Sequence, residues 1–159
     1  MSLAPRILPA LSGGDDALLR KVIEVFEDEG FVVVGAHDVA PGLLARHSQL
    51  AGPEPSERDL ADMARGEDIL AALAPVDVGQ GVVVAGGLCL GIETIQGTDA
   101  MLAAVAATSA GLRPDPANGA GILFKAPKPG QDWRVDLPSL GPGTVAAASA
   151  AGLAGIAFR

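Results

Sequence analysis

Two short apolar runs joined by a pair of glycines constrain the fold of this chain most strongly. Residues 82–85 and 88–92 flank Gly86-Gly87. A two-residue connection of this kind favours a tight β-hairpin, because primed turns need positive φ angles that glycine adopts readily. Cys89 then falls inside a strand, where we expect a small core residue rather than a nucleophile. The chain therefore contains at least one antiparallel pair of strands.

Helical patterns lie on both sides of this hairpin. Apolar residues at helical spacing predict a first helix from Asp15 or Asp16 to a stop at Gly30. A second helix is predicted to begin at Ser56, because Ser56 and Asp59 have the spacing of a capping box. Two more helices are expected: one opens at Gly97-Thr98-Asp99, with Thr98 as its cap, and ends at Gly111, and the other covers 145–151.

Three further apolar runs predict strands. Residues 31–34 are wholly apolar, which is the pattern of a strand buried on both faces. Residues 122–124 and 155–158 are shorter runs of the same kind. Because helices alternate with strands and one pair of strands is a hairpin, we predict an α/β fold: a three-layer sandwich with a mixed sheet.

Composition excludes several classes of protein. Only 3% of the 159 residues are aromatic and there is no Tyr, so a platform for stacking single-stranded nucleic acid is not expected. The net charge of −8 also disfavours binding to a phosphate backbone. One Cys and two His are too few for a typical zinc site or an internal disulfide. We expect a globular intracellular protein that does not bind nucleic acid.

The carboxyl-terminal segment is uncharged but broken. Residues 137–158 carry no charge, yet they contain two prolines and several glycines. A buried helix followed by a strand fits this composition better than a membrane span. Because the sequence stops just after a strand-like run, we expect it to be part of a longer protein.

Polar residues gather first at 93–99, where a strand passes into a helix. Thr98 has the position of a helix cap, and the helix dipole favours Asp99 in the first turn. Capping alone is one reading of these residues. The other places Glu93 and Asp99 around a shared ion or water, because ligands of α/β sheets gather at the carboxyl ends of strands.

The second polar cluster is the loop at 125–136. Lys125 and Lys128 are candidate phosphate binders, and the pair Asp132 and Asp136 offers the hard oxygen atoms that Mg²⁺ prefers. In an extended segment Asp132, Arg134 and Asp136 would face one way, with Trp133 packed on the opposite side. A merely charged turn is the alternative.

Two weaker candidates lie earlier in the chain. Gly13-Gly14 followed by Asp15-Asp16 lacks the Gly-Lys-Ser/Thr of a phosphate-binding loop, so helix capping is favoured there. His37 follows the predicted strand at 31–34 and could act as a general acid or base. A polar residue at the start of a loop explains His37 equally well.

An ordered set of segments resembles one known family. It comprises Gly13-Gly14-Asp15-Asp16-Ala17-Leu18-Leu19-Arg20, Val33-Val34-Gly35-Ala36-His37, Asp77-Val78-Gly79-Gln80, Gly97-Thr98-Asp99-Ala100-Met101, Lys128-Pro129-Gly130-Gln131-Asp132 and Ala151-Gly152-Leu153-Ala154-Gly155-Ile156-Ala157. Together they closely resemble the C-terminal domain of the LpxI family, the UDP-2,3-diacylglucosamine pyrophosphatases of lipid A synthesis. The resemblance covers nearly the whole chain after residues 1–13, which we interpret as a lead-in, and assigns 14–159 to that domain.

The resemblance implies a Mg²⁺-dependent hydrolase that releases UMP and 2,3-diacylglucosamine 1-phosphate in the cytoplasm or at the inner face of the membrane. Asp99 carries over as the prime catalytic candidate, with Lys128 and Asp132 beside it. The remaining candidates are substrate-binding residues, Thr98, Lys125, Gln131, Arg134 and His37, and metal ligands, Glu93, Asp99 and Asp136. A cation and a lysine would neutralise the diphosphate while a carboxylate activates water.

Two departures from the family pattern shape the remaining expectations. Gln96 stands where family members usually carry Glu, so a non-catalytic module that binds a sugar nucleotide or lipid phosphate stays open as a second hypothesis. The family's N-terminal domain is expected to be absent, with the substrate lying between the two domains. From this we expect residues 1–159 to be one inactive domain of a larger enzyme. A homodimer is a further expectation from the apolar content.

Overall fold

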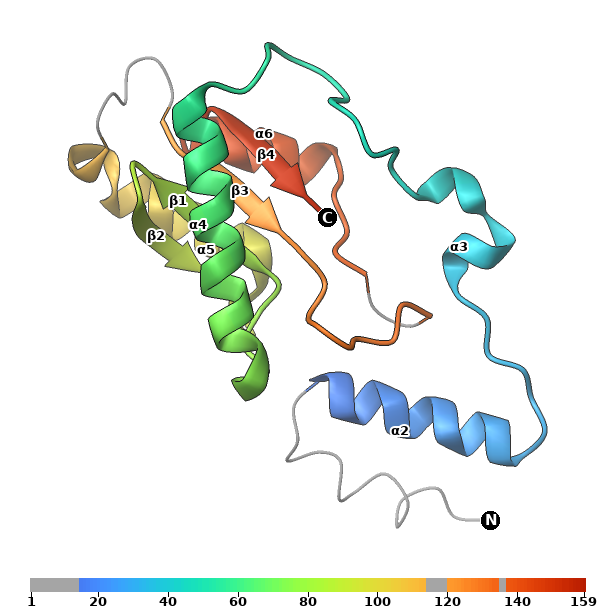
Figure 1. Cartoon of the computed structure of the whole chain (residues 1–159). Coiled ribbons are helices and arrows are strands. Elements are labelled where there is room, and N and C mark those ends of the chain that lie inside the picture. The colour runs from blue at the N-terminus through green and yellow to red at the C-terminus, as the bar shows by residue number, and fades with distance from the viewer. Residues whose placement is uncertain (1–14, 114–119, 135–136) are drawn as a thin grey trace. The chain divides into compact units, whose positions relative to one another are not determined.

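A computed structural model describes residues 15–113, 120–134 and 137–159 (Figure 1). The chain divides into two compact units. The first unit comprises Met1–Gly52 and Gly130–Leu137, and the second comprises Pro53–Pro129 and Pro138–Arg159. No helix in the described ranges is long and apolar enough to cross a membrane, in agreement with the broken composition of residues 137–158.

The second unit is built on a mixed four-stranded sheet. Its strands are β1 (Gly81–Ala85), β2 (Leu88–Ile92), β3 (Ile122–Lys125) and β4 (Gly155–Phe158), in the order β2-β1-β3-β4. β1 pairs antiparallel with both β2 and β3, whereas β3 pairs parallel with β4. Gly86 and Gly87 join β1 to β2 with φ angles of 58° and 79°. The predicted hairpin is therefore confirmed, and so is the mixed sheet.

Helices cover both faces of this sheet. Figure 1 shows α4 (Glu57–Leu73) on one face and α5 (Gly97–Thr108) with α6 (Pro142–Ala150) on the other. Because side chains alternate along a strand, β1 and β3 feed two separate apolar clusters. The α4 side holds Leu70, Val82, Val84, Ile122 and Phe124. The opposite side holds Val83, Met101, Leu102, Val105, Leu123, Ala148 and Ala151. The predicted three-layer α/β sandwich is confirmed.

One buried carboxylate ties α4 to the hairpin. Asp62 is 1% exposed, and its two oxygens accept hydrogen bonds from the backbone N–H groups of Gly86 (2.9 Å) and Gly87 (2.7 Å). The turn would otherwise leave these donors to solvent or unpaired. Helical spacing alone did not single out this contact.

Helix boundaries in the second unit mostly follow the sequence. Ser56 caps α4, and its side chain forms the predicted capping box with Asp59. The cap of α5 differs from expectation: Gln96 occupies the N-cap position, so Thr98 lies inside the first turn. Cys89 lies in β2 as predicted, but it is exposed because β2 is an edge strand. Short 3-10 turns, η3 (Ala74–Val76) and η4 (Ala110–Leu112), follow α4 and α5.

The described part of the first unit is helical and irregular. It contains α2 (Asp15–Asp28), which ends just before Gly30 as predicted, then α3 (Ala36–Val39) and η2 (Pro41–Leu43). The strand predicted at 31–34 is wrong: these residues form no strand, and Val32 is 86% exposed. A strand needs a neighbour for its backbone groups, and the described residues of this unit form none. Phe31 instead packs edge-on against Phe26, with ring centroids 5.9 Å apart.

Candidate functional site

Polar side chains gather at one edge of the sheet of the second unit. Since β1 opposes both β2 and β3, and β3 is parallel to β4, the three strands β2, β3 and β4 point the same way. Glu93 follows the last residue of β2, and Lys125 is the last residue of β3. Ligands of α/β sheets bind beyond such carboxyl ends. This is the place where the sequence predicted a site.

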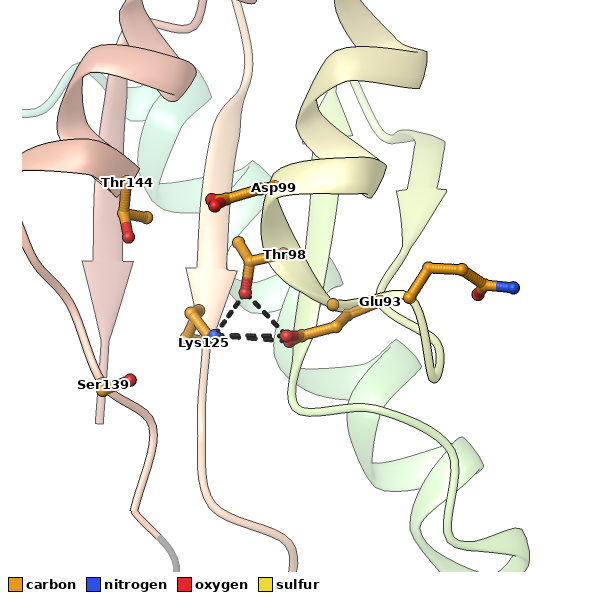
Figure 2. A pocket seen from close by; sticks show the side chains of 8 residues that line it. Glu93, Thr98, Asp99, Lys125, Ser139 and Thr144 are labelled. Carbon is orange, nitrogen blue, oxygen red and sulfur yellow. Dashed lines mark hydrogen bonds and ion pairs between the residues drawn. The ribbon is translucent and has the colours of Figure 1, made fainter.

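A pocket of about 320 Å³ opens at this edge. It lies between the first turn of α5 and the beginning of α6. The lining residues are Glu93, Gln96, Gly97, Thr98, Asp99, Lys125, Ser139 and Thr144 (Figure 2). Both helices present their amino-terminal ends here, where free backbone N–H groups and the helix dipole favour an anion. The pocket therefore combines two positive helix ends with one cationic side chain.

Lys125 is held in this pocket by two neighbours. It is only 5% exposed, and its Nζ donates to Thr98 Oγ1 at 2.7 Å and to Glu93 Oε1 at 3.4 Å. Thr98 Oγ1 in turn donates to Glu93 Oε1 at 2.6 Å, which closes the triangle of dashed lines in Figure 2. Thr98 is thus a polar member of the site rather than the helix cap that the sequence predicted.

Glu93 is closely confined. Its side chain is 14% exposed, and its Oε2 makes no hydrogen bond within the described residues, although the Lys125 ammonium lies 3.4 Å away. Two glycines make room for it. A Cβ on Gly81 would lie 2.6 Å from Glu93 Oε2, and one on Gly79, whose φ is 60°, would lie 2.0 Å from the Glu93 carbonyl oxygen. Sequence reasoning missed this role, for which the spacing of Gly79 and Gly81 was the available signal.

Asp99 lies on the first turn of α5 and is exposed at the pocket wall. The first-turn position that the sequence predicted is confirmed. A carboxylate in the first turn of a helix interacts favourably with the positive end of the helix dipole. An accessible carboxylate that lines a pocket can orient a water molecule or bind a cation.

The pocket contains two carboxylates, Glu93 and Asp99, that could take part in holding a Mg²⁺ ion. Within the described residues, no three His, Cys, Asp or Glu side chains are grouped so that they could hold a metal ion alone. Mg²⁺ commonly needs only one or two protein carboxylates and completes its shell with water and phosphate oxygens. Asp99 and Glu93, whose Oε2 makes no hydrogen bond within the described residues, offer such a pair. Asp136, the third predicted ligand, lies outside the described residues.

Lys128 belongs to the same unit but makes a different contact. Its Nζ donates to Asp77 Oδ1 in an ion pair whose lysine and aspartate side chains are 13% and 22% exposed. Asp77 was not a predicted site residue. Lys128 therefore lies in the loop after β3, as expected, but paired with an acid from the turn before β1.

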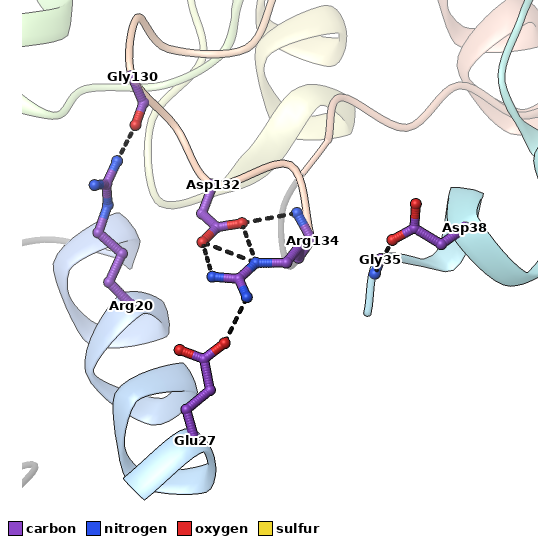
Figure 3. Close-up of polar contacts among 7 residues, drawn as sticks. All are labelled: Arg20, Glu27, Gly35, Asp38, Gly130, Asp132 and Arg134. Carbon is purple, nitrogen blue, oxygen red and sulfur yellow. Dashed lines mark hydrogen bonds and ion pairs between the residues drawn. The ribbon is translucent and has the colours of Figure 1, made fainter. Parts of the chain in front are cut away.

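Asp132 and Arg134 form a local pair in the first unit (Figure 3). Arg134 donates to Asp132 from its backbone N (3.0 Å) and from Nε (3.0 Å) and Nη2 (2.7 Å) of its guanidinium. These bonds lower the pKa of Asp132 from its usual 3.8 to about 2. The side-chain hydrogen bonds of Arg134 have the largest effect, and its backbone hydrogen bond has the next largest. Such a carboxylate is a poor proton acceptor near neutral pH.

This loop is not the extended segment that the sequence predicted. A turn at Trp133 and Arg134 brings the backbone of Arg134 onto the Asp132 carboxylate, and Trp133 is 56% exposed instead of packed. Arg134 also bonds Glu27 of α2 (2.6 Å), and Arg20 of α2 donates to the Gly130 carbonyl oxygen. The charges of the loop thus anchor it to α2.

The last two candidates also lie in the first unit. Gln131 is 7% exposed. His37 is in the short helix α3, and its Nδ1 is buried without a hydrogen bond in the described part of the chain. Because Asp132 belongs to one unit and Asp99 to the other, the expected place of Asp132 beside Asp99 stays a prediction.

Comparison with known proteins gives matches over almost the entire chain. Residues 46–159 match the model of the LpxI C-terminal domain, and residues 2–43 match that of the LpxI N-terminal domain. A protein of Caulobacter vibrioides, named UDP-2,3-diacylglucosamine pyrophosphatase LpxI, is 42% identical over 156 residues. The match covers 98% of this chain and 56% of that relative, so the chain spans just over half the relative's length.

These matches correct one expectation from the sequence. The N-terminal domain of the family was expected to be absent, but residues 2–43 match it. With that, the reason for expecting an inactive single domain is removed. Short segments such as Val33-Val34-Gly35-Ala36-His37, which the sequence reading assigned to the C-terminal domain, fall within the N-terminal match.

Proposed function

The chain belongs to the LpxI family, and from that premise we propose that it hydrolyses the diphosphate bond of UDP-2,3-diacylglucosamine. The products would be UMP and 2,3-diacylglucosamine 1-phosphate, in the synthesis of lipid A. The observation that carries the proposal is Lys125: a lysine with 5% exposure held beside two helix amino-termini and next to the accessible Asp99.

The surroundings of Lys125 are better explained by binding of a diphosphate than by a contribution to folding stability. A buried ion pair contributes little net stability, because desolvation of both charges offsets their attraction. An arriving phosphate would find the Lys125 ammonium, the Thr98 hydroxyl and the N–H groups of the first turn of α5 already in place. Preorganised donors of this kind stabilise the charge that develops on phosphate oxygens as the P–O bond breaks.

Asp99 is the proposed partner of the attacking water. In hydrolysis the water oxygen bonds to one phosphorus, the bridging P–O bond breaks, and the bridging oxygen leaves with the other phosphate. Asp99 would orient this water and accept its proton. A Mg²⁺ ion, for which Asp99 and Glu93 are the proposed ligands, would neutralise charge on the diphosphate when bound.

The proposed substrate carries two acyl chains, so we place the reaction at the inner face of the membrane. Lys128, Gln131, Asp132, Arg134 and His37 remain proposed contributors to substrate binding or catalysis, and Asp136 a proposed metal ligand. The bidentate contact with Arg134 favours an anchoring role for Asp132 over a role as general base.

UMP release by the wild-type chain and by Asp99→Ala tests the proposal. We expect Asp99→Ala to lose turnover by lowering kcat, with substrate binding largely retained, because Asp99 acts mainly in the transition state. Asp59→Ala is a matched control, since Asp59 stands three residues after the cap of α4 as Asp99 stands three after the cap of α5. It should lower stability by about 0.5–2 kcal/mol and leave turnover intact.

The opposite outcome would reject the assignment. If Asp99→Ala melts at a lower temperature but releases UMP at the wild-type rate, Asp99 serves only to stabilise the first turn of α5. Thermal melting and steady-state kinetics on both variants make the distinction.

A binding module without chemistry is the second candidate, and Gln96 is the residue that favours it. Gln96 lines the pocket with a neutral amide where the family resemblance leads us to expect Glu. Under this reading the wild-type chain binds the sugar nucleotide and releases no UMP, and Gln96→Glu introduces hydrolysis. UMP release by the wild-type chain would remove this candidate.

A further inference from the structure

Asp77 combines three features that each oppose stability. Its φ of 55° and ψ of 44° lie in the left-handed region, which aspartate adopts less readily than glycine does. Its Oδ2 is buried and has no hydrogen-bond partner within the described residues. Its Oδ1 is engaged in the largely buried pair with Lys128. If the residue at position 77 served only to end the turn η3, glycine would be more stable there. We therefore look for a role of the Asp77 carboxylate other than stability.

The backbone places this pair at the same sheet edge as the pocket. Asp77 precedes Gly79 by two residues, and Gly79 approaches the Glu93 carbonyl so closely that no side chain fits between them. The Ala126 N–H also donates a hydrogen bond to the Gln80 carbonyl oxygen at 3.0 Å. That bond ties the segment after Asp77 to the segment between Lys125 and Lys128.

We infer that Asp77 is a positioning residue that holds Lys128 at this edge as a second cation for the diphosphate. The inference rests on the proposed function. A diphosphate carries several negative charges, and Lys125 is the one cationic side chain among the residues that line the pocket. A lysine side chain loses much rotamer freedom when it is immobilised by a ligand. Asp77, itself fixed by its turn, restricts Lys128 before the ligand arrives and so lowers that loss.

The test measures KM, kcat, affinity for inorganic pyrophosphate and melting temperature for four variants of the chain. Asp77→Asn removes the charge and tolerates the left-handed backbone, Asp77→Gly also relieves the backbone strain, Lys128→Ala removes the cation, and the fourth combines Asp77→Asn with Lys128→Ala. Asp68→Asn, an exposed acid of α4 in the same unit, is the control.

We expect Asp77→Asn and Asp77→Gly to weaken pyrophosphate binding and to raise KM by about tenfold, because the ligand must then immobilise the Lys128 side chain itself. The double variant should be no weaker than Lys128→Ala alone, because Asp77 acts through Lys128. Asp68→Asn should match the wild-type chain in every measurement.

Other outcomes overturn the inference in recognisable ways. Wild-type KM and pyrophosphate affinity in Asp77→Asn, with or without a lower melting temperature, leave Asp77 a structural residue. Additive losses in the double variant show that Asp77 does not act through Lys128. If the wild-type chain binds pyrophosphate through this pair but releases no UMP, the proposed function fails and the inference stands. If the wild-type chain does not bind pyrophosphate, the inference fails as well.

Discussion

The two units of this chain treat similar apolar runs in opposite ways. Residues 82–84 of β1 are fully buried between α4 and α5, whereas Val32 of the run at 31–34 is 86% exposed. Both runs are wholly apolar, and their side chains have similar β propensities. The difference is that β1 has hydrogen-bonded strands on both sides. Apolar composition thus permits a strand, and neighbouring strands decide whether it forms.

The carboxylates of the two units differ in a parallel way. In the second unit, Asp62 and Glu93 are confined by backbone donors or close glycines. In the first unit, Asp132 pairs with Arg134 in a turn where the two side chains are 21% and 34% exposed. We therefore expect side chains of the two units to contribute differently to stability, and three comparisons test this.

The largest contrast is expected from truncating one apolar side chain in each unit. Leu102 is 0% exposed between the sheet and α6, so Leu102→Ala should lower the free energy of unfolding by about 2–5 kcal/mol. Val32→Ala should change it by no more than about 0.5 kcal/mol. Chemical denaturation measures both. Equal losses would mean that residues 31–34 are packed in solution, contrary to the structure.

A smaller effect is expected at the buried Asp62. Asp62→Ala leaves the N–H groups of Gly86 and Gly87 without their partners, so we expect a loss of about 1–3 kcal/mol. Asp68→Ala, on the exposed side of the same helix, is the control and should stay within about 0.5 kcal/mol. Thermal and urea denaturation test the pair. A neutral Asp62→Ala would show that water replaces the carboxylate at the turn.

The smallest effect concerns acid titration in the first unit. Because the pKa of Asp132 is lowered to about 2, its pairing with Arg134 stabilises the folded chain above the usual carboxyl pKa. That contribution declines as the pH falls from about 4 towards 2. NMR titration should give Asp132 a midpoint near 2 in the wild-type chain. In Arg134→Met the midpoint should return towards 3.8, and a midpoint that does not move would rule out Arg134 as the cause.

Much of the fold could be predicted from local pattern. The hairpin, the capping box at Ser56, the helix stop before Gly30 and all four strands of the sheet follow from residue spacing and glycine placement. Segments 93–99 and 125–128 were also correctly identified as polar junctions at strand ends. These features depend on residues close in sequence, so a single segment contains the information.

Features that depend on distant residues were not predicted. Asp77 and Lys128 are 51 residues apart, and the residues around Asp62 in the sequence do not indicate its contact with Gly86 and Gly87. From its residue type and position Thr98 was predicted to cap the helix, yet its hydroxyl forms hydrogen bonds with Lys125 and Glu93 in the pocket. Local sequence spacing cannot predict which of several possible hydrogen-bond partners a side chain takes, because these partners belong to other segments of the chain.

The sequence by itself determined the α/β class, the order of most elements and the family, since periodicity, turn glycines and ordered motifs are properties of the linear chain. Only the tertiary structure decided that Lys125, Thr98 and Glu93 form one network, that Asp77 holds Lys128, and that residues 31–34 are not a strand. Each of these outcomes depends on which distant group satisfies a backbone or side-chain polar atom, and only the assembled sheet brings those groups within reach.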